Sequence, residues 1–205
     1  ARTCTAGCQS TSYGYVCGGQ TPTAVNVIEK FSFASDGNSA DTGQNLLRAV
    51  YYVSSTGASS STHGYSTGGW FNSGRYNEIS KFQFNASSNA TDVGDMTTTR
   101  QSPTQTNSQT HGYSAGGHAN TSIDKWTFSS DANGTDIGDL ANVCGSGSGH
   151  ASTTHGYITY HAGSGVLLIE KFSFSANGNS TFVGNLITGT YGYYTAGSSS
   201  SNHGY

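Results

Sequence analysis

Residues 111–140 read HGYSAGGHANTSIDKWTFSSDANGTDIGDL, and this stretch decides the fold. Residues 123–128 place apolar Ile123, Trp126 and Phe128 among polar neighbours, which is typical of a β-strand with one buried face. Asn133 and Gly134 follow, and both tolerate the positive φ angles that hairpin turns demand. The stretch therefore predicts short antiparallel strands joined by tight turns. The extra residue after Ile123 interrupts the alternation and favours a β-bulge there.

The motifs of this stretch recur along the whole chain. The triplet His-Gly-Tyr starts at four positions, with Tyr13-Gly14-Tyr15 as a variant: His63, His111, His155 and His203. The strand motif starts at Ile28, Ile79, Ile123 and Ile169, and the last motif at Thr91, Thr135 and Thr181. The triplets are 44–50 residues apart, which is the length of one propeller blade.

Each repeat has room for about four short strands, and one such sheet cannot bury both of its faces alone. The sequence therefore predicts an all-β protein, a β-propeller of four-stranded antiparallel blades. We expect four full repeats at about 1–47, 48–97, 98–141 and 142–187, with a partial fifth at 188–205. The chain is then a single domain or a section of one, and the propeller has five or more blades. A linear stack of sheets is the alternative.

Composition agrees with this fold and argues against several function classes. Gly, Ser, Thr and Asn supply 102 of the 205 residues, so a helical protein is excluded. Charged residues make up only 9%, as expected if most strand faces meet another sheet. A net charge of −3 with eight Lys and Arg argues against nucleic acid as a partner. No apolar run reaches the roughly 18 residues of a membrane span. Because the chain begins with Ala1, we expect it to be processed or part of a longer one.

The order of motifs resembles the kelch-type β-propeller blade. The resemblance implies that Arg2, Arg48 and Arg100 open blades and that a Gly pair closes the second strand, as at Gly18-Gly19. It also implies a third strand with an aromatic residue at Phe31, Phe82, Trp126 and Phe172. The chain departs from the kelch pattern because the usual fourth-strand Trp is absent, the Gly pair is replaced at Tyr160-His161, and the Arg is replaced by Cys144. The amino-acid sequence of the repeated motifs also looks like repeats found in phage and marine viral structural proteins.

The repeated histidines are the first candidate site, since one His per blade could converge on the propeller axis and bind a metal. The first repeat carries Tyr13 at that position, so we expect hydrogen bonding to a neighbouring blade or backbone instead. Residues 131–136 loosely match a calcium loop, but the other repeats replace the acids, which favours a plain hairpin turn. The repeated lysines lie beside acidic residues, and we expect them to form ion pairs or cover an aromatic ring: Lys30, Lys81, Lys125 and Lys171.

Cysteines and asparagines offer two kinds of modification. Cys4, Cys8 and Cys17 lie close together in sequence, so a disulfide among them is one option and free buried thiols are the other. Cys144 lies apart. Sequons for N-glycosylation occur at five positions that we expect to be accessible: Asn85, Asn89, Asn120, Asn133 and Asn179.

No nucleophile elbow, phosphate loop or zinc-protease motif is present, so we expect no enzyme, catalytic residue, cofactor or metal. The leading hypothesis is a structural or adhesive propeller of a virion appendage or other extracellular assembly, with other subunits and glycans as partners. The alternative is a lectin, in which four aromatic residues would stack on sugars: Trp70, Phe71, Tyr51 and Tyr52. A third hypothesis is an enzyme on a kelch-like scaffold, such as a copper oxidase.

Overall fold

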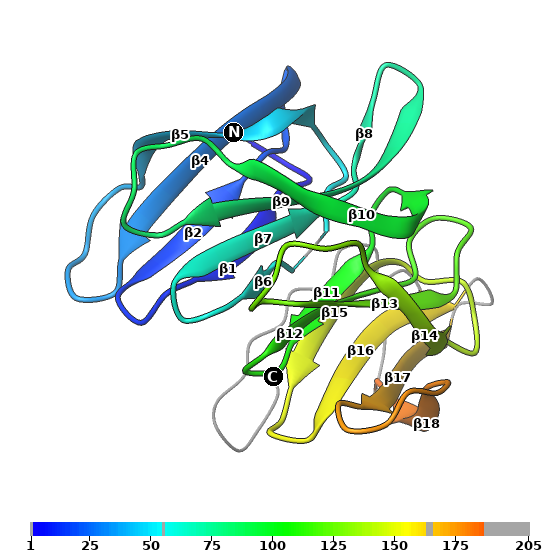
Figure 1. The fold of residues 1–205 in the computed structure, drawn as a ribbon. Helices are drawn as coiled ribbons and strands as arrows, with labels where there is room; N and C mark the ends of the chain where they lie inside the picture. Colours follow the sequence, from blue (N-terminus) through cyan, green and yellow to red (C-terminus); the bar gives the residue numbers. More distant parts are fainter. Residues whose placement is uncertain (1, 55, 163–165, 187–205) are drawn as a thin grey trace.

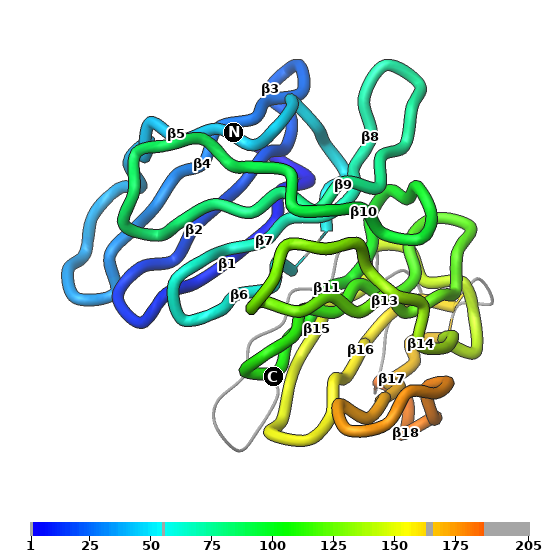
Figure 2. The backbone as a smooth tube through the Cα atoms, in the orientation of Figure 1, coloured from blue at the N-terminus to red at the C-terminus, as the bar shows by residue number. Residues whose placement is uncertain are grey.

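The computed structural model describes residues 2–54, 56–162 and 166–186, and these ranges contain strands and no helix. The strands form four antiparallel sheets that follow one another in sequence order (Figures 1 and 2). In each sheet, the four main strands pair in the order in which the chain makes them. The predicted all-β class and the four-stranded antiparallel sheets are therefore confirmed.

The first sheet contains β1 (Ala6–Gln9), β2 (Tyr13–Cys17), β3 (Gln20–Thr21), β4 (Thr23–Ser32) and β5 (Ala40–Val50). The second contains β6 (Ala58–Ser59), β7 (His63–Thr67), β8 (Trp70–Phe71), β9 (Gly74–Gln83) and β10 (Thr91–Arg100). The third contains β11 (Thr104–Asn107), β12 (His111–Ala115), β13 (Ser122–Thr127) and β14 (Thr135–Asp139). The fourth contains β15 (Gly145–Ala151), β16 (His155–Ala162), β17 (Val166–Ser173) and β18 (Thr181–Asn185).

Two arginines lie elsewhere than the kelch resemblance implied. Arg48 lies within β5 and Arg100 ends β10, so both belong to the last strand of a sheet and neither opens one. The Gly pairs do follow the second strand directly, and Gly18 and Gly19 both have positive φ, 62° and 100°. The expected partial fifth blade at 188–205, with His203, lies outside the described residues.

The glycine of each His-Gly-Tyr motif is needed because an aromatic ring covers it. Gly112 in β12 is directly opposite Trp126 in β13, and a Cβ at Gly112 would overlap the indole ring. The same pairing joins glycine and Phe in the other three sheets, at Gly14–Phe31, Gly64–Phe82 and Gly156–Phe172. Ring-over-glycine packing between neighbouring strands fills the space that the missing side chain leaves and fixes the register.

The predicted irregularity after Ile123 is present, and its extra residue lies on the neighbouring strand. Ile123 pairs with Gly138 and Asp124 with Asp136, which leaves Ile137 as the bulged residue of β14. Gly138 has φ 147°, and a Cβ there would overlap the backbone of Gly178 in the turn of the next sheet. This glycine therefore allows the next sheet to approach closely.

Consecutive sheets pack face to face through the tyrosine of the motif. Tyr65 of the second sheet stacks on Phe128 of the third, with ring centroids 4.8 Å apart and planes at 20°. Two other junctions repeat this contact, with Tyr15 on Phe84 and Tyr113 on Phe174, also at 4.8 Å. In each repeat the glycine and tyrosine are neighbours on one strand, so they point to opposite faces of the sheet. The first three sheets thus present a tyrosine face to the next sheet, and the second to fourth sheets receive that tyrosine on their ring face.

A hydrogen-bonded asparagine joins the same sheets at their outer turns. The side-chain oxygen of Asn133 accepts a hydrogen bond from the backbone N–H of Asp95 in the previous sheet, at 3.0 Å. Asn89 does this for Asn45, and Asn179 for Asp139. The backbone carbonyl of Asp95 in turn accepts a bond from the N–H of Gly134, at 2.7 Å. Three of the five sequon asparagines therefore hold neighbouring sheets together, a role that sequence reasoning missed.

Replacing Asn133 with alanine is expected to destabilise the protein by about 1 kcal/mol, because the Asp95 N–H loses its partner. Urea unfolding followed by tryptophan fluorescence measures this change. Asn85 is an exposed sequon asparagine, and Asn85→Ala is the matched control, with no expected change in the midpoint. Equal effects of the two substitutions would contradict the role assigned to Asn133.

The first strands of the four sheets lie beside one another (Figure 1). The N–H of Gly57, just before β6, donates to the carbonyl of Gly7 in β1, at 2.7 Å. The N–H of Ala58 in β6 donates to the side-chain oxygen of Gln105 in β11. Thr106 of β11 donates its hydroxyl to the carbonyl of His150 in β15. Hydrogen bonds therefore join the first strands of the four sheets in sequence order.

Candidate functional site

The four aromatic residues that the sequence offered for ligand contact lie together in the structure. The backbone of Tyr51 exchanges two hydrogen bonds with that of Trp70, at 3.1 and 2.7 Å. The Tyr51 and Tyr52 rings meet edge to face at 5.0 Å, and Phe71 follows Trp70 in β8. The Arg75 guanidinium lies 6.0 Å from the centre of the Trp70 ring. We call Tyr51, Tyr52, Trp70, Phe71 and Arg75 the aromatic–arginine patch.

A tight hairpin holds the patch at the end of the second sheet. Trp70 pairs with Arg75 and Phe71 with Gly74, around a turn at Asn72 and Ser73. Both turn residues have positive φ, 48° and 66°, which suits the right-handed twist of a two-residue hairpin. The hairpin projects from the rest of the molecule at the top of Figure 1. All four aromatic side chains are half-buried, so each has one surface fixed by the protein and one in solvent.

A second arginine extends the charge of this region. The Arg48 guanidinium lies over the Tyr76 ring at 4.4 Å and forms an ion pair with Glu78. Burial raises the pKa of Glu78, and Arg48 opposes that shift. Arg48 is therefore paired with Glu78, and Arg75 is the arginine that lies beside the aromatic rings of the patch.

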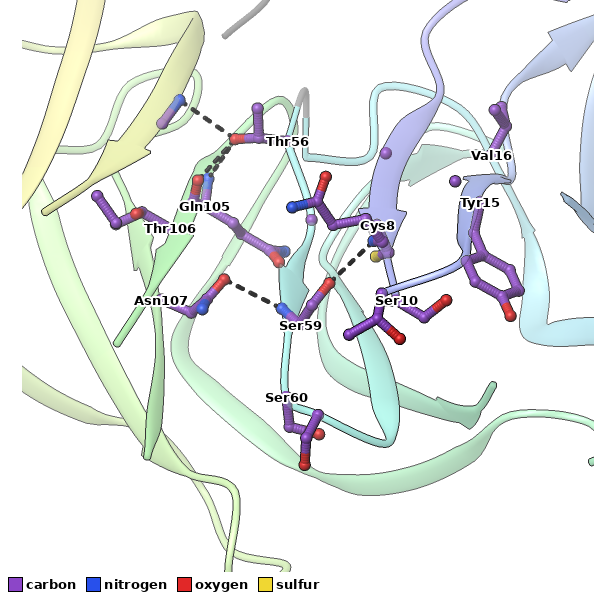
Figure 3. Close-up of a pocket in the computed structure, with 18 of the residues that line it drawn as sticks. Cys8, Ser10, Tyr15, Val16, Thr56, Ser59, Ser60, Gln105, Thr106 and Asn107 are labelled. Atoms are coloured by element: carbon purple, nitrogen blue, oxygen red, sulfur yellow. Dashed lines mark hydrogen bonds between the residues drawn. The ribbon is translucent and has the colours of Figure 1, made fainter. Parts of the chain in front are cut away.

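A cavity of about 740 Å³ lies along the first strands of the sheets (Figure 3). Its wall combines hydroxyl and amide side chains on or beside β1, β6 and β11 with a larger apolar area, to which Phe31 and Phe33 of the first sheet belong. Several of these polar groups already hold the strands together: the N–H of Gln9 donates to the Ser59 hydroxyl, and the N–H of Ser59 donates to the Asn107 side chain. The wall contains His150 as its one ionisable imidazole and lacks carboxylates among the described residues.

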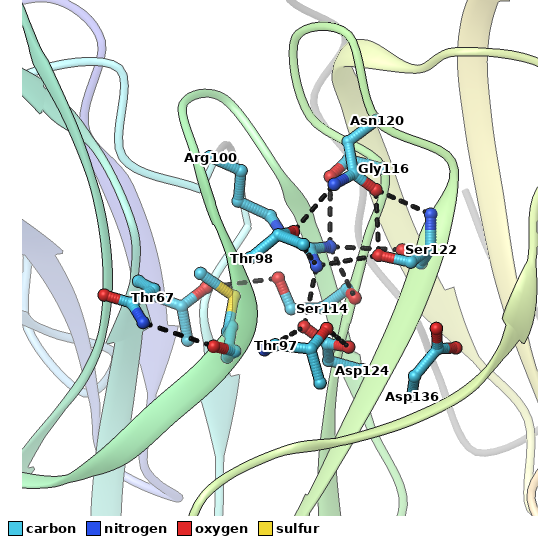
Figure 4. A network of polar contacts seen from close by, with 12 residues as sticks. Thr67, Thr97, Thr98, Arg100, Ser114, Gly116, Asn120, Ser122, Asp124 and Asp136 are labelled. Carbon is cyan, nitrogen blue, oxygen red and sulfur yellow. Dashed lines mark hydrogen bonds and ion pairs between the residues drawn. The ribbon is translucent and has the colours of Figure 1, made fainter.

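A buried ion pair joins the second and third sheets (Figure 4). The Arg100 guanidinium and the Asp124 carboxylate are 2.7 Å apart, and both side chains are 0% exposed. Arg100 also donates to the carbonyls of Gly116 and Ser122, each at 3.1 Å. Asp124 accepts from the N–H and hydroxyl of Thr97, at 3.0 and 2.7 Å. Burial lowers the pKa of Arg100, and Asp124 opposes that shift. Every contact here is within the protein, so we assign the pair a structural role.

The fourth sheet fills the equivalent place without a cation. Glu170 stands where Asp124 does, and it accepts hydrogen bonds from the hydroxyls of Tyr160 and Ser180 and from the N–H of Ala141. Burial and the bond to Glu170 raise the pKa of Tyr160. Cys144, which replaces the arginine, is buried, and burial raises its pKa to about 12. Cys144 stands where the preceding repeat has Arg100, and Tyr160-His161 stands where the other sheets have a Gly pair. The two differences are linked, because the Tyr160 hydroxyl donates to Glu170 as the Arg100 guanidinium donates to Asp124.

The repeated histidines each bond locally. The ring Nδ1 of His63, His111 and His155 lies 2.8–2.9 Å from the hydroxyl of the preceding threonine. Burial lowers the pKa of His63 and of His111. Within the described ranges, no group of three or more His, Cys, Asp or Glu is arranged to hold a metal ion. Asp131 of the loosely calcium-like turn forms an ion pair with Lys81 of the previous sheet, at 2.6 Å.

The remaining candidates are spread over the surface and core. Cys4, Cys8, Cys17 and Cys144 are free thiols, so the disulfide considered among the first three is absent from this structure. Cys8 and Cys17 are buried on adjacent strands, and the hydrogen bond between them is the largest cause that raises the pKa of Cys17. Asn85, Asn89, Asn133 and Asn179 are exposed, and Asn120 is half-buried.

Neither a comparison with protein-family models nor a search of curated proteins finds a match to this chain. Among the described residues there is no helix with the length and apolar character needed to cross a membrane.

Proposed function

We propose that the chain is a non-enzymatic section of a β-propeller and serves a structural or adhesive role in a virion appendage or other extracellular assembly. The sheets are its blades, and the first strands of the sheets surround its axis. Support for a propeller comes from the junction between sheets, which uses the same tyrosine stack and asparagine bond three times in succession. Identical junctions rotate each module by the same amount, as in radial or solenoid repeats.

The aromatic–arginine patch carries the adhesive part of the proposal. Trp, Tyr and Arg are the residues that contribute most to binding at protein interfaces, and aromatic faces also suit the apolar faces of sugars. The patch gathers all three residue types, with Trp70 and Arg75 on the projecting hairpin and Tyr51 and Tyr52 on the segment that pairs with it. By contrast, the buried charges Arg100, Asp124 and Glu170 are committed to contacts inside the protein. Contact with a glycan or with a neighbouring subunit is therefore the use that this surface supports best.

Replacing Trp70 with alanine is expected to weaken binding to a glycan at least tenfold, since one central aromatic is worth about 1.4 kcal/mol or more. A glycan array probed with the labelled full chain identifies the ligand, and calorimetry compares the variants. Phe182 is an exposed aromatic on the fourth sheet, and Phe182→Ser is the matched control, with unchanged binding.

The binding results distinguish a glycan partner from a protein partner and test the role of the patch. An array without binding to well-folded chain removes glycans and leaves a protein subunit as the partner. Binding that Trp70→Ala leaves intact, with thermal melting unchanged, contradicts the role of the patch.

A further inference from the structure

The ring face of the first sheet is open, whereas the same face is covered in the three sheets that follow. Phe31 and Phe33 are 40% and 52% exposed. Their counterparts in the second sheet, Phe82 and Phe84, are 1% and 4% exposed beneath Tyr15. Two large rings left in solvent form an apolar surface of the kind that marks an interaction site.

The turn of the first sheet repeats this difference. Asn38 occupies the place that Asn89, Asn133 and Asn179 occupy in the later repeats, and its side chain makes no hydrogen bond with any described residue. In those repeats the asparagine accepts a hydrogen bond from the previous sheet. The first sheet therefore carries both parts of a complete docking surface for a preceding module.

The cavity shows where such a module would enter. Phe31 and Phe33 line it from the first sheet, and His150 and Ala151 of β15 line it from the fourth. The space between the two sheets is thus continuous with the open ring face. Among the described residues, the ring contact of Tyr157, the motif tyrosine of the fourth sheet, is with His155, at 6.4 Å.

The chain itself contains a segment that matches this surface. Residues 195–205 read TAGSSSSNHGY, and residues 5–15 read TAGCQSTSYGY, with identity at six of eleven positions. Tyr205 is therefore the counterpart of Tyr15, Tyr65 and Tyr113. The segment comes after Leu186, which follows the last strand of the fourth sheet. In the earlier repeats, three to seven residues suffice to return from the last strand of one sheet to the first strand of the next.

We propose that residues 195–205 dock on the open ring face of the first sheet, with the Tyr205 ring stacked on Phe33. The contact would close the gap between the fourth and first sheets and bury the two exposed rings. The inference rests on the repeat geometry of the proposed propeller and is independent of the patch, since Trp70 lies on another sheet.

A cysteine pair tests the contact directly. Tyr205→Cys and Phe33→Cys are combined in the 205-residue chain, with Cys4, the half-exposed native cysteine, replaced by serine. A short bismaleimide reagent is used because cysteines in place of two stacked rings are too far apart for a disulfide. On dilute protein it is expected to give an internal cross-link, seen as a faster monomer band on a denaturing gel. Tyr205→Cys with Phe182→Cys is the matched control and should give no such band. A cross-linked dimer would instead identify a second copy as the occupant, and absence of any cross-link would also overturn the proposal.

A melting experiment covers the case in which the cysteines perturb the fold. Tyr205→Ala is expected to lower the melting temperature by roughly 2–4 °C, and to have no further effect when Phe33 is already alanine. Tyr194→Ala, in the same segment but outside the repeated motif, is the control and should not interact with Phe33→Ala. Additive effects of Tyr205→Ala and Phe33→Ala would refute the stacking. Trp70→Ala should leave both tests unchanged, so failure here is distinguishable from failure of the adhesive function.

Discussion

Replacing Arg100 with methionine is expected to destabilise the protein by about 3–5 kcal/mol. The substitution leaves Asp124 as a buried carboxylate without its cation, and breaking one half of a buried pair has this cost. It also removes the donors that Gly116 and Ser122 accept from. Urea unfolding with tryptophan fluorescence as the signal measures the loss, since Trp126 lies in the same sheet.

Two further variants make this result specific. Arg48→Met removes an ion pair with a 45% exposed arginine, so we expect a change of about 1 kcal/mol or less. Arg100→Met combined with Asp124→Leu should recover part of the stability, because no unpaired charge stays buried. If Arg100→Met and Arg48→Met shift the midpoint equally, the buried pair does not join the sheets as described.

Replacing Gly112 with valine should cost about 3 kcal/mol. A Cβ at this position overlaps the Trp126 ring, so the indole or the strand must move out of a packed layer. Trp126 is 3% exposed and packs near Tyr65 of the previous sheet, which leaves little room for that movement. The same unfolding measurement applies, with circular dichroism to follow the strands.

The control for this prediction is Gly7→Val. Gly7 also lies in a strand, but a Cβ there would meet nothing within 4 Å, so we expect a change within about 0.5 kcal/mol. In a Trp126→Ala background, the cost of Gly112→Val should fall, because the overlapping ring is gone. A large effect of Gly112→Val that persists without the indole would rule out ring overlap as the cause.

The sequence predicted the strands well because their signals are local. The alternation around Trp126 and the Asn-Gly turns identify a half-buried strand and its hairpin without any knowledge of the neighbours. The aromatic cluster at Tyr51 and Trp70 was also predictable as a set of candidate residues. Their proximity depends on the pairing of Tyr51, in the segment before β6, with Trp70 in β8. No periodicity in the sequence predicts that pairing.

The junctions between sheets could not be predicted in the same way. The sequon pattern at Asn133 resembled a surface turn, and only the neighbouring sheet shows that its side chain accepts a bond from Asp95. The Arg100–Asp124 pair was equally hidden, since the second repeat has Ser80 at the acidic position and the fourth has Glu170 without an arginine. The kelch resemblance assigned Arg100 to the start of a blade. In the structure the Arg100 backbone ends the second sheet, and its side chain bonds to Asp124 of the third.

The junction of tyrosine, ring pair and turn asparagine has an evolutionary consequence. Each sheet contacts its neighbours through the same tyrosine–ring and asparagine contacts. These contacts can therefore still form after a gene duplication or deletion adds or removes one whole repeat. Unequal recombination can then change the number of repeats without any substitution at the junctions. Selection could act separately on the hairpin of β8, because none of its residues belongs to the repeated tyrosine–ring or asparagine contacts.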